Sequence, residues 1–400
     1  MPGPGFYFYG EEERQEVEEV LSSGYLSRYG SEDDPQFKHK VFTFESEFSQ
    51  KMGVQYCIAV NSGTSALMAS LVAVGIKPGD EVLIPGYTFI ASMSSVIAVG
   101  GRPVLVDVDE SLTMDPTDAE NKISDRTSII MPVHMLGAPS DIARIQALAE
   151  KYNLTIIEDC CQALGGSYRG KCLGAYGALG AFSLNNFKVI NSGDGGVLIT
   201  NQKELYHKAF AFHDQGHLPL RKGVEIGSRT LIGINMRMNE LTGAFALGQL
   251  RKLDIILSTL RQKKELFKQA IKAGNLRDMR YRPIHDPGEC ATLLTVQFPD
   301  EKITNKVTEA LHSKSLFYSG WHVYNNMEQL LAYTDPSGNQ PYYKYMLPAT
   351  DAILRRSVNL SVGVVDKGLG ADFGINALSS EDEIYRKADE FVRILRPIVG

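Results

Sequence analysis

The chain of 400 residues is 44% hydrophobic and 22% charged, which is typical of a globular protein with more than one hydrophobic core. Its net charge of −6 and its dispersed basic residues argue against nucleic acid or an anionic membrane as a partner. No stretch approaches the roughly 20 apolar residues that span a bilayer, and the N-terminus lacks the basic start and apolar core of a signal peptide.

From about residue 55 to 200 the chain alternates short β-rich runs with helical patterns. We predict helices between the earlier strands, at residues 65–75, 91–100 and 142–152, from their apolar spacing of three or four. This alternation indicates an α/β fold with a mixed, mostly parallel sheet sandwiched by helices, in which ligands bind beyond the carboxyl ends of the strands. The predicted strands cover residues 56–60, 81–84, 103–108, 128–133, 154–157, 180–184 and 196–200.

A helical pattern of about 30 residues opens at Met238 and continues towards Ile271, longer than a typical globular helix. Shorter elements follow it, so we predict a smaller C-terminal α+β domain over residues 261–400. A large domain over 13–260 and an N-terminal segment over 1–12 complete the chain. The elements predicted in the small domain are strands at 293–298 and 356–360, helices at 304–313 and 380–395, and a loop at 332–348.

The first predicted strand is followed by residues 61–66, Asn-Ser-Gly-Thr-Ser-Ala, which open a helix. A strand that leads through glycine and hydroxyl residues into a helix start is typical of an anion site, because the first N–H groups point outward. A phosphate is the expected guest. Simple capping of the helix by Ser62 or Thr64 is an alternative that the pattern leaves open.

Polar or aromatic residues also follow the other strands. Phe89 follows the second strand, and Asp159 and Lys188 follow later ones, with Gln162 and Ser183 beside them. A buried lysine with an acid at a strand end is the minimal equipment for pyridoxal 5′-phosphate (PLP): the amine forms a Schiff base, and the carboxylate keeps the pyridine nitrogen protonated. Taken singly, Phe89 could be core, Asp159 a cap or ion-pair member, and Lys188 a surface lysine. The glycine-rich run 192–196 after Lys188 fits a close approach to a ligand or a plain hairpin.

The order of these features resembles the sugar-type aminotransferases of fold type I, the DegT/DnrJ/EryC1/StrS family. The resemblance runs from about residue 10 to 265 and continues more weakly to the end. It is carried by Ser62-Gly-Thr-Ser-Ala-Leu67, Pro85-Gly-Tyr-Thr-Phe89, Ile157-Glu-Asp-Cys-Cys-Gln-Ala163, Phe182-Ser followed by Lys188, Gly193-Asp-Gly-Gly196 and Gly233-Ile-Asn-Met-Arg-Met-Asn-Glu-Leu241.

The resemblance implies a PLP-dependent aminotransferase that moves an amino group from glutamate or glutamine to a keto-sugar or related carbonyl compound. Lys188 would form the internal aldimine and shuttle protons, and Asp159 would pair with the pyridinium nitrogen. The remaining cofactor contacts that it implies are Phe89 and Gln162 against the ring, Gly63, Thr64, Ser65 and Ser183 at the phosphate, and Asn235 at the phosphate of a neighbouring subunit. Asn235 thus implies a homodimer with shared active sites.

One segment departs from the Arg, spacer, His-Gly pattern of the sugar-nucleotide members, and together with two others it looks more like the branch that aminates 3-deoxy-octulosonate at C8, whose acidic substrates carry no nucleotide. The three segments are residues 212–217, 24–29 and 321–326. Arg28 could then bind a carboxylate, although a structural ion pair is equally compatible. His217 and His322 are candidate polar contacts to substrate, with a structural histidine as the alternative for each.

Other functions are weighed against this one. A nicotinamide enzyme would need Gly-x-Gly-x-x-Gly between a strand and a helix, whereas residues 368–374 have the wrong spacing. A PLP enzyme for cyclisation, elimination or oxidation, or a non-catalytic PLP-binding relative, stays open. No metal site is expected: the five cysteines lack paired zinc spacing, and Cys160 and Cys161 adjoin in a predicted core, which favours the reduced cytoplasm.

Overall fold

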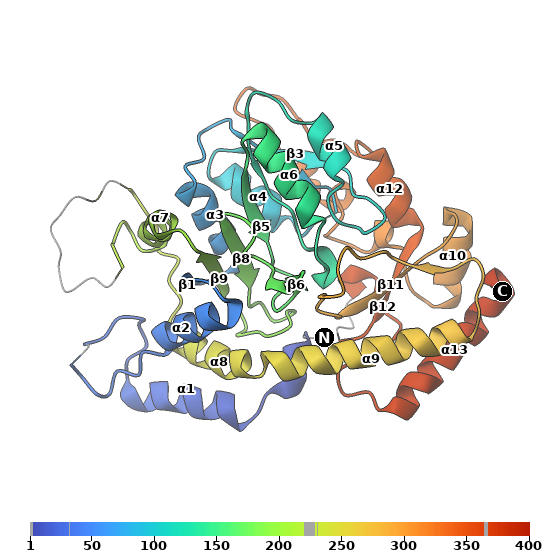
Figure 1. Ribbon diagram of the computed structural model, residues 1–400, viewed down its shortest axis with the longest axis horizontal. Helices are drawn as coiled ribbons and strands as arrows, with labels where there is room; N and C mark the ends of the chain where they lie inside the picture. The colour runs from blue at the N-terminus through green and yellow to red at the C-terminus, as the bar shows by residue number, and fades with distance from the viewer. Residues whose placement is uncertain (1–2, 32, 220–228, 230, 364–366) are drawn as a thin grey trace.

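The computed structural model describes residues 3–31, 33–219, 229, 231–363 and 367–400 of the chain (Figure 1). Its centre is a seven-stranded sheet with the order β1-β9-β8-β5-β4-β2-β3. Strand β9 is antiparallel to both of its neighbours, and the other four pairings are parallel. The predicted mixed, mostly parallel sheet is therefore confirmed. Its strands are β1 (Tyr56–Val60), β2 (Glu81–Pro85), β3 (Arg102–Val106), β4 (Thr127–Ile130), β5 (Thr155–Asp159), β8 (Leu179–Ser183) and β9 (Gly196–Thr200).

Helices cover both faces of this sheet, and the alternation of side chains along β1 shows how. Cys57 and Ala59 join one buried cluster, and Ile58 and Val60 join the other. Because a strand buried on both faces needs apolar residues at every position, β1, β2, β8 and β9 read as continuous apolar runs. The helices on the Cys57 face include α2 (Lys40–Met52), α6 (Ile142–Tyr152) and α8 (Glu240–Arg251), and those on the other face are α3 (Gly63–Ala73), α4 (Ala91–Ala98) and α7 (Lys203–His213).

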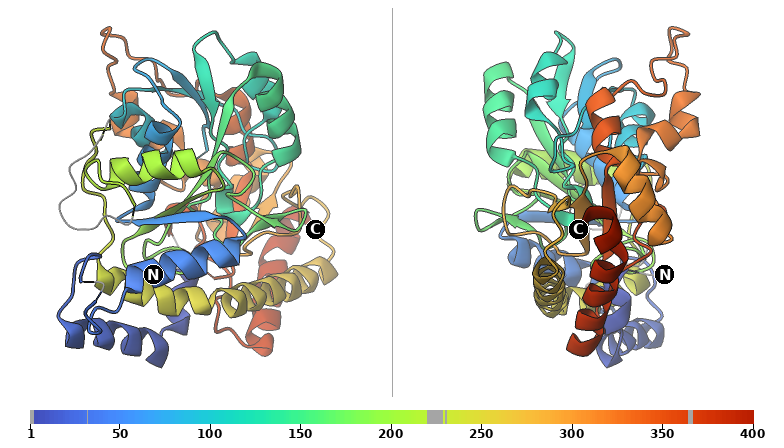
Figure 2. Two further views of the ribbon diagram at one scale, coloured as in Figure 1. Left: turned by 60° about the vertical axis from the view of Figure 1, so that its left-hand side comes forward. Right: turned by 90° about the vertical axis from the view of Figure 1, so that its right-hand side faces the viewer.

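A second, three-stranded sheet forms from the C-terminal part of the chain, and two of its strands, β11 and β12, correspond to the two that were predicted. It has the order β10-β11-β12, with antiparallel pairing throughout. Helix α13 packs against α9 beside this sheet (Figure 2). The elements here are β10 (Arg280–Tyr281), β11 (Leu293–Gln297), β12 (Ser357–Ser361), α9 (Leu253–Ala273), α10 (Glu301–Ala310), α11 (Glu328–Leu331), α12 (Pro348–Arg355) and α13 (Glu381–Val399).

The prediction of one helix from Met238 to Ile271 is wrong, because the chain forms two helices, α8 and α9, that meet at Lys252. They lie end to end along one side of the molecule (Figure 1). The Lys252 ammonium binds Glu13 and the Phe8 carbonyl oxygen, which holds the junction in place. Both helices bury their apolar faces in the same cluster. The hydrophobic pattern therefore continues across the junction, and the sequence shows no sign that one helix ends there and another begins. The predicted domain boundary near residue 260 falls inside α9.

The N-terminal part contains two helices, α1 (Glu11–Ser23) and α2, for which the sequence pattern gave no prediction. Helix α1 lies against α8. Of the predicted N-terminal segment, residues 1 and 2 lie outside the described part. A short helix, η1 (Pro4–Phe8), precedes α1, and the Gly3 amide donates a hydrogen bond to the Asn186 carbonyl oxygen at 2.8 Å. The N-terminus is thereby fixed beside the β8–β9 connection.

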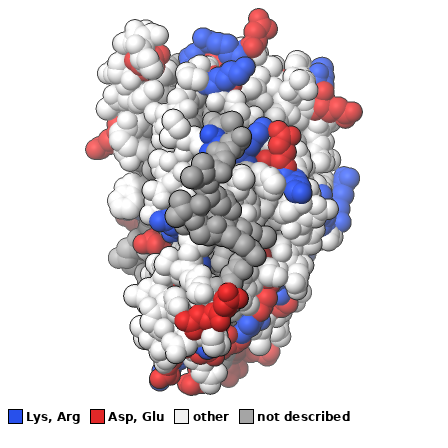
Figure 3. All heavy atoms as spheres, turned by 90° about the vertical axis from the view of Figure 1, so that its left-hand side faces the viewer, with Lys and Arg blue, Asp and Glu red and all other residues white. Residues whose placement is uncertain are grey.

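Surface charge is mixed where the structure describes it. On the face turned to the viewer in Figure 3, Lys and Arg side chains alternate with Asp and Glu rather than forming one continuous basic area. Among the described helices, none combines the length and the hydrophobicity needed to cross a bilayer.

The remaining short elements are α5 (Pro116–Asn121), β6 (Ser167–Tyr168), β7 (Lys171–Cys172), η2 (Met135–Gly137), η3 (Leu316–Tyr318), η4 (Tyr324–Asn326) and η5 (Lys367–Leu369).

Candidate active site

A cavity of about 750 Å³ opens at the carboxyl ends of β1, β2, β4, β5 and β8. This is where the strand order of an open α/β sheet predicts a ligand. The segments after these strands form its floor, and residues 314–322 and 368–369 from the C-terminal part form its outer wall. Of the residues predicted from sequence, Gly63, Thr64, Phe89, Asp159, Gln162, Ser183, Lys188 and His322 line it.

One end of the cavity is the N-terminus of α3. Ser62 caps the helix by accepting a hydrogen bond from the Ser65 amide at 3.1 Å, so the predicted cap is present. A Cβ added to Gly63 would lie 2.8 Å from the Cβ of Ser183, and one added to Gly196 would lie 2.3 Å from the Ser62 carbonyl oxygen. These close approaches explain why glycine stands at both positions. The helix start is pressed onto β8 and β9, with its first N–H groups free to bind an anion.

Ser65 differs from the prediction, because its side chain does not line the cavity. It is buried, and its hydroxyl donates to Asn61 Oδ1 at 2.6 Å and lies 2.9 Å from Ser62 Oγ. In a helix the side chain direction turns by about 100° per residue, so the successive residues Thr64 and Ser65 point in different directions. Ser62, Thr64 and Ser183 supply the hydroxyl groups on the cavity wall.

Asp159 ends β5 at the bottom of the cavity and is only 3% exposed. Its Oδ2 accepts a hydrogen bond from Ser92 Oγ at 2.7 Å, and its Oδ1 accepts one from the Cys161 amide at 3.0 Å. The Ser92 hydroxyl lies 2.6 Å from Thr88 Oγ1, which continues the network. The carboxylate is therefore held in one orientation, with its remaining lone pairs available to a ligand.

Phe89 and Lys188 both line the cavity. The sequence had also allowed Phe89 to be a core residue and Lys188 a surface lysine. Phe89 is 44% exposed and lies outside the buried core, with its ring 5.8 Å from that of His322. Lys188 is partly buried in the β8–β9 connection, and its amide donates to Asn185 at 2.9 Å. This connection joins two antiparallel strands, so its glycine-rich run, residues 192–196, is part of a hairpin. The same run also borders the cavity, through Asp194 and Gly195.

Two polar side chains complete the described wall. Gln162 Oε1 accepts a hydrogen bond from the Leu136 amide at 3.1 Å. His322 carries a buried Nδ1 that has no hydrogen-bond partner among the described residues. Burial, together with the positive charge of Lys188, lowers the pKa of His322 to about 3. The imidazole is therefore neutral at physiological pH, with one nitrogen available to a ligand.

Arg28 does not reach this cavity. It is 1% exposed, and its guanidinium donates two hydrogen bonds of 3.1 Å to Glu45, with His213 Nε2 at 3.2 Å. Of the two readings that the sequence left open for Arg28, a substrate carboxylate and a structural ion pair, the structure shows the ion pair, with Glu45. Asn235 and His217 also lie away from the cavity wall; Asn235 is exposed, and its Oδ1 accepts from the Arg237 amide at 3.2 Å.

The arginine network predicts sensitivity to acid. Burial lowers the pKa of His213 from 6.5 to about 3, with Arg28 adding to the effect. Below pH 6.5 the unfolded chain therefore binds a proton that the native state does not. As the pH is lowered, the free energy of unfolding decreases by up to about 1.4 kcal/mol per pH unit. We expect urea denaturation of His213→Gln to show a shallower loss of stability between about pH 6 and pH 4.5 than the unmodified protein. Parallel curves would contradict this.

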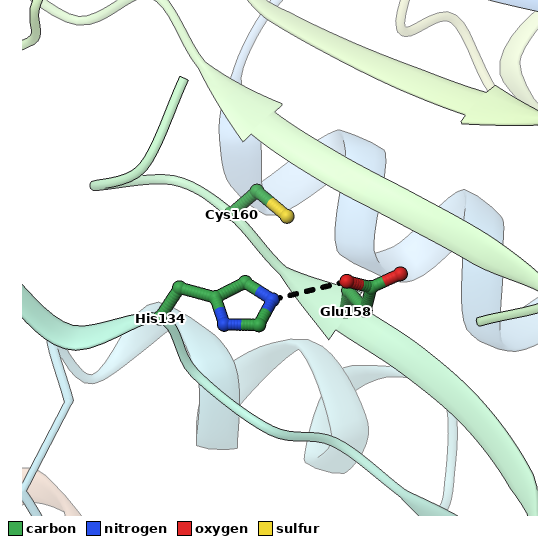
Figure 4. Close-up of side chains that lie close together, drawn as sticks. All are labelled: His134, Glu158 and Cys160. Carbon is green, nitrogen blue, oxygen red and sulfur yellow. Dashed lines mark hydrogen bonds and ion pairs between the residues drawn. The ribbon is translucent and has the colours of Figure 1, made fainter. Parts of the chain in front are cut away.

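Behind the cavity, His134, Glu158 and Cys160 lie close enough together to suggest a metal site (Figure 4). The polar side-chain atoms of His134 and Glu158 are already hydrogen-bonded. His134 Nδ1 accepts from the Ser140 amide at 3.1 Å, so Nε2 carries the proton and donates to Glu158 at 3.1 Å. The carboxylate also accepts from three backbone N–H groups in the turn at residues 174–177, at 2.6 to 2.9 Å. These hydrogen bonds hold Glu158, and with it the end of β5, in place.

Comparison with known proteins places this geometry in context. A model of the DegT/DnrJ/EryC1/StrS aminotransferase family matches residues 8–365. GDP-perosamine synthase of Escherichia coli O157:H7 is 37% identical over 262 residues, which are 65% of this chain and 69% of that protein. L-glutamine:2-deoxy-scyllo-inosose aminotransferase of Micromonospora echinospora is 37% identical over 246 residues, 60% of this chain, and the match spans only 58% of that enzyme.

Solved structures share the whole architecture. The aminotransferase from Psychrobacter cryohalolentis matches with a TM-score of 0.80 and 26% identity over 100% of both chains. The structure of 3-amino-5-hydroxybenzoic acid synthase matches with a TM-score of 0.80 and 24% identity over 97% of each chain. The predicted fold is confirmed across the chain, including the C-terminal third where the sequence resemblance is weak.

Proposed function

The chain belongs to the DegT/DnrJ/EryC1/StrS aminotransferase family and is a PLP-dependent aminotransferase, and from this premise we propose that it moves an amino group from glutamate or glutamine to a keto-sugar or a related cyclic ketone. The observation that carries the proposal is one cavity that joins Lys188, Asp159 and the N-terminus of α3. Relatives named for GDP-perosamine and for inosose amination support a carbohydrate or cyclitol acceptor.

The cavity residues fit PLP. The free N–H groups of α3, with the hydroxyls of Thr64 and Ser183, would hold its phosphate. Asp159, fixed by two hydrogen bonds, would lie beside the pyridine nitrogen, and Phe89 would cover the ring. Lys188 would carry the cofactor, and Gln162 would flank it. The buried His322 Nδ1 is a further polar atom that a ligand could satisfy. Ser65 acts indirectly, by bracing Asn61 and Ser62.

The residues divide the chemistry between them. When bound, PLP withdraws electrons from the carbon that bears the exchanging amine. The negative charge of Asp159 would hold a proton on the ring nitrogen of the bound cofactor by a charge-assisted hydrogen bond. Lys188 Nζ takes the proton from the donor carbon and returns one to the carbon that receives the amine, as a general base and then a general acid.

A second copy of the chain would complete the site. Asn235 is exposed and lies away from its own cavity, in a segment where Ile232 is 94% exposed and Ile234 is also exposed. Apolar side chains at such exposure favour burial against a partner. We therefore propose a homodimer in which Asn235 reaches the phosphate in the other subunit. The free thiols of all five cysteines support the cytoplasm as the compartment.

The spectrum of the purified holoenzyme tests the function. We expect a yellow protein whose visible absorbance disappears on addition of glutamate or glutamine, with formation of the corresponding 2-oxo acid. Adding a panel of keto-sugars and ketocyclitols should restore the colour only with a true acceptor, and mass spectrometry should detect the aminated product. A coloured protein that no amino donor bleaches would contradict amino transfer and favour elimination, cyclisation, oxidation or binding without turnover.

A further inference from the structure

The outer wall of the cavity carries a cation that the cofactor does not use. Lys314 is exposed and lines the cavity, and its ammonium forms no hydrogen bond or ion pair with any residue that the structure describes. The other charged groups on the described wall are Lys188, Asp159 and Asp194. Asp194 contacts Asn185 at 3.4 Å, and the other two belong to the cofactor site. Lys314 is thus an unpaired positive charge facing the substrate space.

The segment that bears Lys314 is built rigidly without it. Ser313 Oγ donates to the Gly370 carbonyl oxygen at 3.1 Å, and Asn326 Nδ2 donates to that of Gly320 at 3.0 Å. The Arg355 guanidinium lies 3.7 Å from the centre of the Phe317 ring. Because other residues hold the fold of this wall, Lys314 has no structural task here, and its removal should leave the wall in place.

Two aromatic residues line the same cavity as Lys314. Trp321, the single tryptophan of the chain, is 72% exposed, and Tyr318 is also exposed on the same wall. The Tyr318 hydroxyl accepts a hydrogen bond from Arg355 at 2.9 Å, which fixes its ring. Exposed rings on a cavity wall offer apolar contact to the C–H faces of a sugar, while the adjacent ammonium offers charge. The combination suits a carbohydrate that carries an acid group.

We propose that Lys314 binds a carboxylate of the substrate and that Trp321 lies against its carbon skeleton, so that the enzyme selects acidic substrates. This inference rests on the proposed amino transfer. A carboxylate matches the single charge of Lys314, the one cation that the described wall of this chain offers outside the cofactor site. The carboxylate can come from the amino donor or from an acidic keto-sugar.

Equilibrium binding to the holoenzyme tests Lys314 without turnover. Glutarate represents the donor carboxylates, methyl β-glucuronide represents an acidic sugar, and methyl β-glucoside is its neutral match. By calorimetry we expect Lys314→Gln to weaken at least one of the two acidic probes about tenfold, as for loss of one charged hydrogen bond, and to leave the glucoside unchanged. Lys314→Arg should retain most of the affinity. Lys306→Gln, an exposed lysine of α10 away from the cavity, is the matched control.

The probe that responds identifies the source of the carboxylate: glutarate indicates the donor and glucuronide the acceptor. Equal affinity of the Lys314→Gln variant and the unmodified protein for both acidic probes would overturn the proposal. So would failure of the unmodified protein to bind either acid, or an equal loss for the neutral glucoside. In steady-state kinetics KM for the carboxylate substrate should rise with little change in kcat. If donors never bleach the holoenzyme while the acidic probes still depend on Lys314, amino transfer fails and the carboxylate subsite stands.

Discussion

Replacing Lys188 with alanine should abolish amino transfer, lowering kcat by about 10³-fold or more, because one residue both carries the cofactor and moves the protons. The side chain reaches the cavity from the β8–β9 connection, where the Asn185 carbonyl oxygen and the Gly3 backbone fix its own backbone. No other lysine lines the described wall except Lys314, which stands on the outer side. A neighbour therefore cannot take over its task.

The measurement has two readouts. The Lys188→Ala protein should lose the yellow absorbance of the holoenzyme and form no 2-oxo acid from glutamate, while its thermal unfolding stays near that of the unmodified protein. Lys77→Ala, an exposed lysine outside the cavity, should keep both the colour and the turnover. Lys188→Arg retains the charge but not the neutral amine, and it should remain inactive. A Lys188→Ala variant that still transfers amino groups would remove the basis of the proposed mechanism.

The sequence brought several of the cavity residues to notice because they stand at or shortly after the ends of strands. Phe89, Asp159, Ser183 and Lys188 each stand within a few positions of a strand end, and parallel strands bring such positions to one edge of the sheet. Ser65 was misjudged because the direction of a side chain in a first helical turn depends on the rotation of the helix, which the motif does not reveal.

The outer wall could not be predicted in the same way. Lys314, Tyr318 and Trp321 are more than 120 residues from Lys188 in the chain, and only the docking of the C-terminal sheet brings them to the cavity. Backbone hydrogen bonds join the two parts beside the cavity, from Thr88 to the His322 carbonyl oxygen at 2.9 Å and from Tyr324 to the Gly86 carbonyl oxygen at 3.2 Å. The sequence also does not show which charged residues are buried. For Arg28 it allowed either a substrate carboxylate or an ion pair, and only the structure shows the pair with Glu45.

The support of Asp159 was also missed, although it decides how the site works. Ser92 lies in α4, 67 residues before Asp159, and its hydroxyl is the donor that orients Oδ2. A serine in a predicted amphipathic helix carries no signal of such a contact. Because of this contact, the activity of a variant without the carboxylate charge can be compared with that of a variant without the hydroxyl group of Ser92 that orients it.

Asp159→Asn should lower kcat by about 100-fold or more while the protein still folds and binds its cofactor. Asparagine has nearly the same shape, and its amide oxygen can still accept from the Cys161 amide, but it carries no negative charge to hold a proton on the ring nitrogen. Loss of a charge-assisted hydrogen bond alone accounts for about 1.5–3 kcal/mol, and the loss of electron withdrawal in the transition state adds to it.

Ser92→Ala, which removes one orienting hydrogen bond and keeps the charge of Asp159, should lower kcat by about tenfold or less. Rates measured with saturating glutamate, beside absorbance and thermal unfolding, separate the two effects. Near-normal turnover of Asp159→Asn, or a larger loss in Ser92→Ala, would show that charge at the end of β5 does not drive the reaction.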